Sequence, residues 1–293
     1  MALIDVAQVN YFYQDGDARR YILKDVSCSF ERGRFYTILG ESGSGKTTLL
    51  SLLSALDKPK SGGVFFDGTD IKQIGYEKYR RNKISIIFQS YNLVPYMTAA
   101  ENVRVAMSVT DNPLPGDLKS VAYNLLDYIG ITRDKADRAV IKLSGGEQQR
   151  VAIARALATN VDVILADEPT GNLDEEMETE IVQIFKRLAH EHNKCVIVVS
   201  HSGRIASESD VTFRLSKGAL LPYPETPAVP EYMPQEAPAQ EPAPAAVPGF
   251  SFDPVPAYDP LLMPDMTASS PEEQAQIESF DFSDVETFDI DNL

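Results

Sequence analysis

The 293-residue chain is 43% hydrophobic, which is enough apolar material for the core of one large domain or two small ones. Its net charge of −16 is uneven: 15 of 43 acidic residues lie from Pro222 onward, where no Lys or Arg occurs, so residues 1–221 hold 28 acidic and 27 basic side chains. This balance excludes the concentrated basic charge of a nucleic-acid-binding domain, and no apolar run approaches the roughly 20 residues that cross a bilayer.

The first 30 residues alternate apolar and polar side chains in two stretches, at about 3–12 and 22–30. The turn signal QDGD at 14–17 lies between them, so the pattern predicts an antiparallel sheet. The two cysteines, Cys28 and Cys195, lie in strand-like runs without the spacing of metal ligands. We expect both to be buried free thiols.

A phosphate-binding loop follows this sheet. The pattern G-x-x-x-x-G-K-[ST] joins a β-branched run at 36–39 to a helix-like run, which is the setting that such a loop requires. Its glycines permit positive φ, so backbone N–H groups converge on phosphate oxygens at the positive end of a helix. Lys46 supplies a cation for the β and γ phosphates, and Thr47 a hydroxyl for Mg²⁺. The residues expected to bind the nucleoside triphosphate are Gly40, Glu41, Ser42, Gly43, Ser44, Gly45, Lys46, Thr47 and Thr48.

The base of such a nucleotide needs a flat partner. Tyr13 ends the first predicted strand just before the turn, and it is a candidate to stack on adenine. Tyr11 and Phe12 compete for this role. Ordinary packing within the strand is the alternative for all three.

Further along the chain, residues 56–63 indicate a helix end and a turn, and residues 64–68 a strand and a turn. The run KISIIF at 83–88 predicts a buried strand, and Gln89 follows at its carboxyl end. Open α/β sheets bind ligands at that end. Gln89 is therefore a candidate to contact a metal ion or a catalytic water.

Residues from about 92 to 145 differ in character, because strand signals stop and helical periodicity appears at 99–107 and 118–129. Gly130 closes the second of these stretches, and a proline-rich break separates the two. We expect a helical insert within the α/β domain. Its local chemistry does not indicate a function.

A second anion-binding helix start follows the insert. Ser144 is a favourable N-cap, and Gly145 and Gly146 leave backbone donors exposed at the positive end of a helix that runs through Ala158. One triphosphate hardly needs two such cradles from one protomer.

Two acidic residues then follow the predicted buried strand at 161–166. Asp167 is suited to hold Mg²⁺, and Glu168 to polarise an attacking water as a general base. A solvated strand end is the alternative interpretation of this pair.

The last of three histidines follows another buried strand, at 195–200. His201 lies at the carboxyl end of that strand, where it is able to donate to a γ-phosphate. His190 and His192 lie at the polar end of the preceding predicted helix, and we expect both to be solvated.

In this order the motifs resemble those of the ATP-binding subunits of ABC transporters, over about residues 2–221. LSGGEQQRVAIARAL at 143–157 matches the family's signature motif, which rarely occurs elsewhere. The loop Asn172-Leu173-Asp174 matches a further motif and adds Asp174 to the expected nucleotide contacts. The family's adenine-stacking position falls on Tyr13. LDKP at 56–59 and ADEPTGNLD at 166–174 look like the lipoprotein-releasing, macrolide-exporting and cell-division type.

The resemblance implies an α/β P-loop ATPase core with an N-terminal antiparallel β subdomain and a helical insert, and an enzyme that hydrolyses ATP with Mg²⁺. The expected metal contacts are Thr47, Gln89 and Asp167, and the expected catalytic residues are Glu168, His201 and Gln89. The family usually carries Asp after the histidine, and here that residue is Ser202. The orientation of His201 is therefore open at this point.

The resemblance also accounts for the second cradle. Such domains dimerise head to tail, so Ser144, Gly145 and Gly146 of one protomer would close over the γ-phosphate bound by Lys46 of the other. The dimer would contain two copies of this chain or one copy and a related chain. Its partner would be an integral-membrane permease that meets the helical insert, which implies a peripheral location at the cytoplasmic face of the membrane. No nucleic-acid partner is expected.

Two other functions fit the same motifs. One is an ATPase that drives a permease-like partner for signalling or mechanical work without moving solute. The other is a soluble regulatory or repair ATPase of the ABC type. Translation-factor versions usually carry two cassettes, whereas this chain has one phosphate loop, and no coiled coil interrupts residues 46–143 as it does in repair versions.

The tail, residues 222–293, lies beyond the resemblance. Residues 222–279 are dominated by Pro, Ala, Glu and Gln, so we expect disorder. In the last stretch, 280–293, aromatic and acidic residues alternate, which is typical of a short docking peptide for a cytoplasmic partner or the permease. A merely solubilising tail is the alternative.

Overall fold

The computed structural model describes residues 2–15, 18–114, 116–171 and 173–223. Asn172 and the predicted tail from residue 224 lie outside these ranges. Within them, no helix is both long and apolar enough to span a bilayer. The strands are β1 (Ala2–Asp15), β2 (Ala18–Glu31), β3 (Phe35–Leu39), β4 (Ser61–Phe66), β5 (Thr69–Asp70), β6 (Ile84–Ile87), β7 (Val163–Asp167), β8 (Cys195–Ser200), β9 (Val211–Ser216) and β10 (Ala219–Pro222). The helices are α1 (Lys46–Leu53), α2 (Ile71–Ile74), α3 (Tyr76–Asn82), α4 (Ala99–Val109), α5 (Leu118–Tyr128), α6 (Arg133–Ala136), the 3-10 turn η1 (Val140–Lys142), α7 (Gly145–Ala158), α8 (Glu175–His190) and α9 (Gly203–Glu208).

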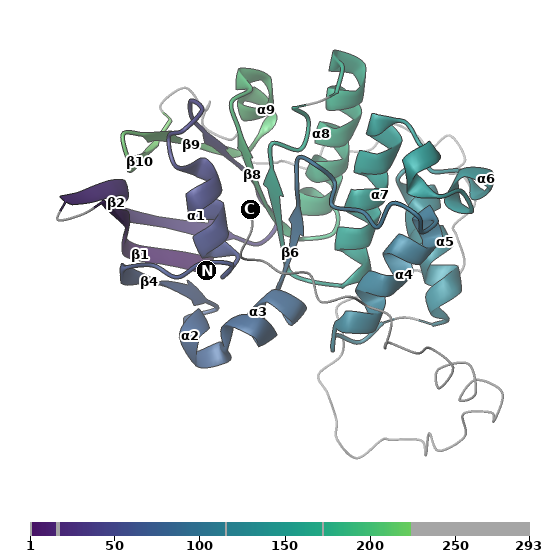
Figure 1. Cartoon of the computed structure of the whole chain (residues 1–293), viewed down its shortest axis with the longest axis horizontal. Coiled ribbons are helices and arrows are strands. Elements are labelled where there is room, and N and C mark those ends of the chain that lie inside the picture. The colour runs from purple at the N-terminus through teal and green to yellow at the C-terminus, as the bar shows by residue number, and fades with distance from the viewer. Residues whose placement is uncertain (1, 16–17, 115, 172, 224–293) are drawn as a thin grey trace, which may run out of the picture. The chain divides into compact units, whose positions relative to one another are not determined.

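A six-stranded sheet with the order β10-β9-β3-β8-β7-β6 forms the middle layer (Figure 1). Strands β9, β3, β8, β7 and β6 run parallel, and β10 pairs antiparallel with β9. Along β8, Val196 and Val198 pack into the core on one face of the sheet, whereas Cys195, Ile197 and Val199 pack on the other. A strand buried on both faces is expected to be apolar throughout, as CVIVVS is.

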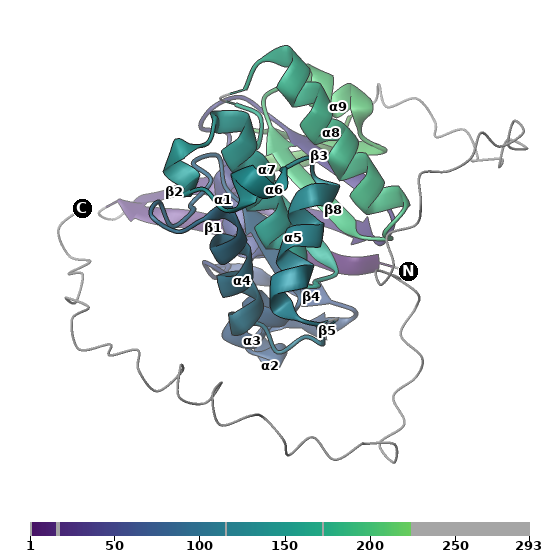
Figure 2. The same ribbon diagram turned by 90° about the vertical axis from the view of Figure 1, so that its right-hand side faces the viewer.

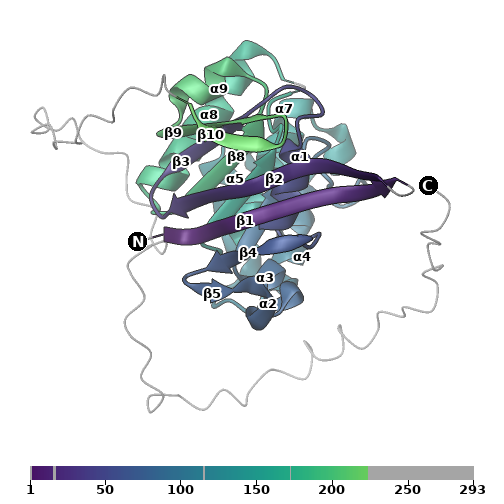
Figure 3. The ribbon, with the colours of Figure 1, turned by 90° about the vertical axis from the view of Figure 1, so that its left-hand side faces the viewer.

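One face of this sheet is covered by α1 and by a second, antiparallel sheet with the order β2-β1-β4-β5 (Figure 3). Leucines of α1, such as Leu49 and Leu52, are fully buried between the two sheets. Strands β1 and β2 confirm the predicted antiparallel sheet. The hydrophobic layer below them fixes α1, and α1 positions the phosphate loop.

The other face of the six-stranded sheet packs against α7 and α8, and the helical insert lies beside them (Figure 2). Helices α4, α5 and α7 share one apolar cluster that includes Val103, Leu126 and Val151. Helices α4 and α5 occupy the two stretches where helical periodicity was found. The short α6 and η1 that follow them were not predicted.

Residues 61–63 are strand and not the predicted turn. Gly62 has a φ of +77°, and a Cβ at this position would collide with the carbonyl oxygens of Ala7 and Gln8. The pairing of β1 with β4 shifts register here, between Ala7 and Asn10. The glycines thus allow a close approach of two strands, a tertiary contact that local turn signals do not reveal.

The expectation of solvated side chains holds for His190, which is exposed, and is wrong for His192, which is half-buried. His190 Nε2 lies 2.9 Å from Asp210 Oδ2. His192 follows the end of α8 at His190, and its Nε2 lies 2.9 Å from the hydroxyl of Tyr128. Burial lowers the pKa of His192. Both side chains tie the end of α8 to neighbouring elements.

The folded part of the chain extends slightly beyond the predicted boundary at residue 221. Pro222 pairs with Phe213 in the β9–β10 ladder, and the backbone N–H of Tyr223 donates to Thr212 O over 2.9 Å. Leu220, one residue before the predicted end, packs against the core. The described fold therefore includes a C-terminal hairpin that the sequence pattern did not indicate.

Candidate nucleotide site

The phosphate loop, Gly40–Thr47, is held in one shape by close packing. A Cβ on Gly40 would lie 2.6 Å from Ser44 Oγ and 2.7 Å from Leu215 O. Gly43 and Gly45 have φ values of +76° and +105°, which side chains disfavour. The Ser44 hydroxyl oxygen is buried and has no hydrogen-bond partner among the described residues. A buried polar atom of this kind is satisfied by a ligand oxygen in such a loop.

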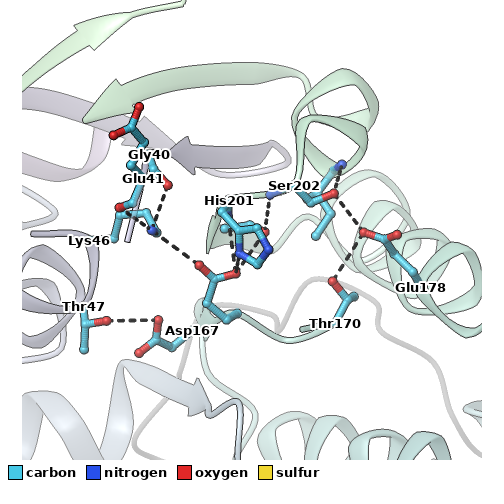
Figure 4. A network of polar contacts seen from close by, with 12 residues as sticks. Gly40, Glu41, Lys46, Thr47, Asp167, Thr170, Glu178, His201 and Ser202 are labelled. Atoms are coloured by element: carbon cyan, nitrogen blue, oxygen red, sulfur yellow. Dashed lines mark hydrogen bonds and ion pairs between the residues drawn. The ribbon is translucent and has the colours of Figure 1, made fainter. Parts of the chain in front are cut away.

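Lys46 lies inside this loop and is almost fully buried (Figure 4). Its Nζ donates to Gly40 O at 2.9 Å and Glu41 O at 3.1 Å, and it lies 3.4 Å from Glu168 Oε1. Among the described residues, the polar contacts of the ammonium group are thus two backbone carbonyls and one carboxylate. This is a site prepared for the negative charge of phosphates. Glu41 and Ser42 are exposed at the tip of the loop, and Thr48 is half-buried on α1.

Thr47 and Asp167 approach each other from the start of α1 and the end of β7 (Figure 4). Thr47 Oγ1 donates to Asp167 Oδ1 over 3.4 Å, and burial raises the pKa of Asp167. No group of three or more His, Cys, Asp or Glu side chains in the described ranges could hold a metal ion. One hydroxyl and one carboxylate fit Mg²⁺, which takes a few protein oxygens and completes its shell with phosphate and water.

Gln89 lies two residues beyond β6, the edge strand next to β7. A Cβ on Gly171 would lie 3.1 Å from its Nε2, so the amide group packs on the loop that follows Glu168. The structure therefore brings Gln89 to the edge of the sheet that carries Asp167.

Glu168 is fixed by several contacts at the end of β7. Its backbone has a φ of +45°, a strained value for a residue with a side chain, and its N–H donates to Val199 O at 2.9 Å. Its Oε2 accepts from Ser200 Oγ at 3.2 Å and from the backbone N–H of His201 at 3.3 Å, and it lies 3.0 Å from His201 Nδ1. The carboxylate thus bridges the ends of two neighbouring strands and faces Lys46.

The sequence analysis did not single out Ser200. It precedes His201 at the carboxyl end of a buried strand, and that position was the available signal. His201 itself is largely exposed, with 68% of its side chain accessible, so its imidazole is open to a ligand.

The second cradle lies at the start of α7. Ser144 and Glu147 form a capping box: Glu147 N donates to Ser144 Oγ, and Ser144 N donates to Glu147 Oε2 over 2.9 Å. Lys135 lowers the pKa of Glu147 through a 2.8 Å ion pair. Among the described residues, no hydrogen bond or ion pair links Ser144, Gly145 or Gly146 to the phosphate loop. The start of α7 is thus preorganised, and its described contacts do not include the phosphate loop of the same chain.

The candidates for stacking on a base differ in exposure. Tyr11 is buried and donates to Asp57 Oδ2 over 2.5 Å, and this bond raises its pKa. Phe12 packs against Tyr21. Tyr13 is 55% exposed, and its ring meets that of Tyr11 in a T-shaped contact, so Tyr13 is the most accessible of the three candidates.

Asp174 directly precedes α8. Its side chain caps α8 by accepting from Met177 N at 2.9 Å. The residue predicted to contact nucleotide is thus also the residue that starts this helix.

Comparisons with a family model and with known sequences agree on one family of relatives. The profile of the ABC transporter family matches residues 23–171. The chain is 47% identical over 220 residues to the uncharacterized ABC transporter ATP-binding protein YclH of Bacillus subtilis, covering 75% of this chain and 96% of that protein. It is 41% identical to the lipoprotein-releasing system ATP-binding protein LolD 1 of Chlorobium chlorochromatii, covering 69% of this chain and 83% of that protein.

A solved structure is similar over the same region. It is the dimeric post-hydrolysis state of the ATP-binding cassette MJ0796 of Methanocaldococcus jannaschii, bound to ADP and Pi. The TM-score is 0.68 at 36% sequence identity, and the match covers 74% of this chain and 96% of that one.

Proposed function

Since this chain belongs to the ABC transporter family of ATP-binding proteins, we propose that Glu168 is the general base with which it hydrolyses ATP. The chain is an ATP-binding and ATP-hydrolysing subunit of that family. The observation that supports the role of Glu168 is the place of its carboxylate, with Oε1 facing Lys46 and Oε2 facing His201. A base so placed lies within reach of a water beside a bound terminal phosphate.

ATP binding changes the partners of Lys46. Its Nζ exchanges the carbonyls of Gly40 and Glu41, and its contact with Glu168, for the oxygens of the β and γ phosphates. The same exchange frees Glu168 Oε1 to accept a proton from the attacking water. His201 holds Oε2 in place from the other side and is exposed enough to donate to the γ-phosphate.

Four further residues complete this proposed site. Thr47 through Oγ1 and Asp167 through its carboxylate would hold Mg²⁺, and Gln89 would contribute its side-chain oxygen from the loop after β6. Bound Mg²⁺ neutralises charge on the β- and γ-phosphate oxygens. Tyr13, whose side chain is exposed, stacks on adenine.

The second cradle acts on the nucleotide of a partner cassette. Ser144, Gly145 and Gly146 of one copy close over the ATP that Lys46 of the other copy binds, with Asp174 at the shared boundary. Two observations support this: the preorganised start of α7 has no bond to its own phosphate loop, and the similar cassette of known structure is dimeric. Two identical copies are the simplest composition of such a dimer.

The names of the relatives support a membrane partner. They include ATP-binding proteins of ABC transporters and of a lipoprotein-releasing system. We infer that the dimer binds an integral-membrane permease through the helical insert, α4 to α6, and lies peripherally at the cytoplasmic face of the membrane. ATP-driven closure of the dimer then supplies the work for transport.

The replacement Glu168→Gln tests this assignment. Glutamine keeps the shape of the side chain but cannot accept the proton, so ATP binding persists while turnover falls by at least ~10²-fold, the usual weight of a general base. Because hydrolysis would separate the two copies, the variant also accumulates as an ATP-bound dimer. ATP binding, steady-state turnover and mass by light scattering measure these three effects.

The matched control is Glu176→Gln, which removes an exposed carboxylate from the first turn of α8. It should leave all three measurements unchanged. Turnover near the wild-type rate in Glu168→Gln would show that another group takes the proton.

A further inference from the structure

Ser202 follows His201 and makes two contacts with one hydroxyl group. Its Oγ caps α9 by accepting from Ile205 N at 3.4 Å, and it donates to Glu178 Oε1 at 3.0 Å (Figure 4). The family usually carries Asp at this position. An ionised Asp could accept the same helix N–H, but it has no proton to donate to Glu178.

Glu178 connects the two loops that border the site. It lies in the first turn of α8, and only 16% of its side chain is exposed. Its Oε1 also accepts from Thr170 Oγ1 at 3.4 Å, and Thr170 is buried in the loop that follows Glu168. One carboxylate oxygen thus accepts from the loop after β7 and from the loop after β8.

The contacts continue from Ser202 to the proposed base. The backbone N–H of Ser202 donates to Ser200 Oγ at 3.0 Å, and that hydroxyl donates to Glu168 Oε2 at 3.2 Å. Between Ser200 and Ser202 lies His201, whose backbone N–H also donates to Glu168 Oε2. A shift of Ser202 would therefore move the donors that orient the Glu168 carboxylate.

We propose that Glu178 is a positioning residue for ATP hydrolysis, and that with Ser202 it fixes the histidine loop, Ser200–Ser202, against the loop that carries Glu168 and Thr170. The pair supplies a carboxylate from α8 where the family usually supplies one from the histidine loop itself. This inference rests on the proposed roles of Glu168 and His201.

The simpler explanation is that Glu178 is one of several acids that favour the positive end of α8. Glu175 and Glu176 share the first turn with it. Charges in that turn interact with the helix dipole to a similar extent. The dipole explanation thus predicts similar changes of kcat in Glu176→Ala and Glu178→Ala, whereas the positioning explanation predicts a change of kcat in Glu178→Ala alone.

The first experiment measures ATP turnover and nucleotide affinity for Glu178→Ala, Glu178→Gln and the control Glu176→Ala. We expect Glu178→Ala to lower kcat by about tenfold while KM for ATP changes less than about twofold, since the contacts of the phosphates are untouched. Glutamine keeps an oxygen that accepts from Ser202 and Thr170, so Glu178→Gln should restore kcat to within about threefold of wild type. Equal losses in Glu176→Ala and Glu178→Ala, or an unchanged kcat in Glu178→Ala, would overturn the proposal.

The second experiment exploits the pairing. Ser202→Asp alone sets a second carboxylate beside Glu178, and like charges at this distance repel, so kcat should fall. In the double variant Glu178→Ala/Ser202→Asp the repulsion is absent, and kcat should rise above that of Ser202→Asp. Additive losses in the double variant would contradict the proposed contact.

A third measurement does not depend on turnover. The chain has three histidines, so the imidazole resonance of His201 is assigned by comparison with His201→Gln. It should shift in Glu178→Ala and stay in place in Glu176→Ala. If Glu178 has no positioning role, the His201 resonance stays unchanged in Glu178→Ala. This outcome would overturn the proposal even if Glu168→Gln loses turnover and so supports Glu168 as the base. If Glu168→Gln keeps turnover while the His201 resonance shifts in Glu178→Ala, the assignment of Glu168 as the base is wrong. The contact between Glu178 and Ser202 is then still supported.

Discussion

The residues of the site show why short motifs predict chemistry well and supporting contacts poorly. Lys46 and Asp167 follow directly from local patterns, because a phosphate loop and a strand end each place them within a few residues of a recognisable signal. Ser200 and Glu178 carry no such signal. Their roles depend on partners, Glu168 and Ser202, that lie 32 and 24 residues away in the chain. Only the packing of β7, β8 and α8 brings them together.

The surroundings of Asp167 disfavour its carboxylate form. Burial raises its pKa, and the neighbouring Glu168 adds repulsion; the hydrogen bond from Thr47 and the charge of Lys46 only partly oppose these effects. A carboxyl group with a raised pKa in the folded state lowers stability as the pH rises above its unfolded pKa, because the folded state then must give up a proton that it binds more tightly.

We therefore predict that Asp167→Asn raises the melting temperature at pH 7 in the absence of Mg²⁺ and nucleotide, while it abolishes Mg²⁺-dependent ATP turnover. The gain should shrink as the pH falls through the raised pKa, since the wild-type carboxyl is then also neutral. Thermal unfolding from pH 4 to pH 8 measures both effects. Asp127→Asn, at an exposed position of α5, is the control. A lower melting temperature for Asp167→Asn at pH 7 would show that the carboxylate stabilises the site.

At the scale of elements, periodicity predicts α4 and α5 because each buries one face in the insert. It does not predict the loop that leads into α4, since that loop is held by tertiary contacts from Arg155 and Val140 and by one buried amide. Asn102, on α4, is 2% exposed. Its Oδ1 accepts from Val94 N at 2.8 Å, and its Nδ2 donates to Val94 O at 3.2 Å and Thr98 O at 3.0 Å. The side chain thus fixes the segment between Gln89 and the helix.

We predict that Asn102→Ala destabilises the fold by about 2 kcal/mol, because it leaves several buried backbone groups without their partner. The matched control is Asn124→Ala at an exposed position of α5, which should change the free energy of unfolding by less than about 0.5 kcal/mol. Urea unfolding followed by circular dichroism gives both values. If the two variants are equally stable, the loop does not depend on this amide.

At the scale of the whole chain, composition distinguishes residues 1–221 from a proline-rich, acidic stretch, but the change in composition does not coincide with the end of the last described strand. The composition changes at Pro222, whereas β10 includes Pro222, and Tyr223 bonds to Thr212. The turn between β9 and β10 also reaches β2, because Lys24 N donates to Gly218 O at 2.8 Å. This hairpin therefore joins the edges of the two sheets. Its short apolar run, ALLP, is too brief for a pattern to reveal.

These contacts lead to a prediction for two truncated chains. A chain that ends at Tyr223 keeps every described contact of β10, so its melting temperature and ATP affinity should match those of the full chain within about 1 °C and twofold, as expected when the removed segment buries little area. A chain that ends at Lys217 loses the β9–β10 ladder and the packing of Leu220. Its melting temperature should fall by about 5 °C, the shift that roughly 2 kcal/mol produces in a domain of this size.

Thermal unfolding of the full chain and the two truncated chains, followed side by side, distinguishes the possible boundaries. A loss of stability in the chain that ends at Tyr223 would show that residues 224–293 pack on the domain, against the sequence-based expectation for the tail. Equal stability in the chain that ends at Lys217 would show that β10 contributes nothing to the fold. Replacing Phe280, Phe282 and Phe288 with Ala in the full chain then tests the docking peptide separately. Because that change leaves the domain intact, it should weaken binding to the permease or a cytoplasmic partner without altering the melting temperature.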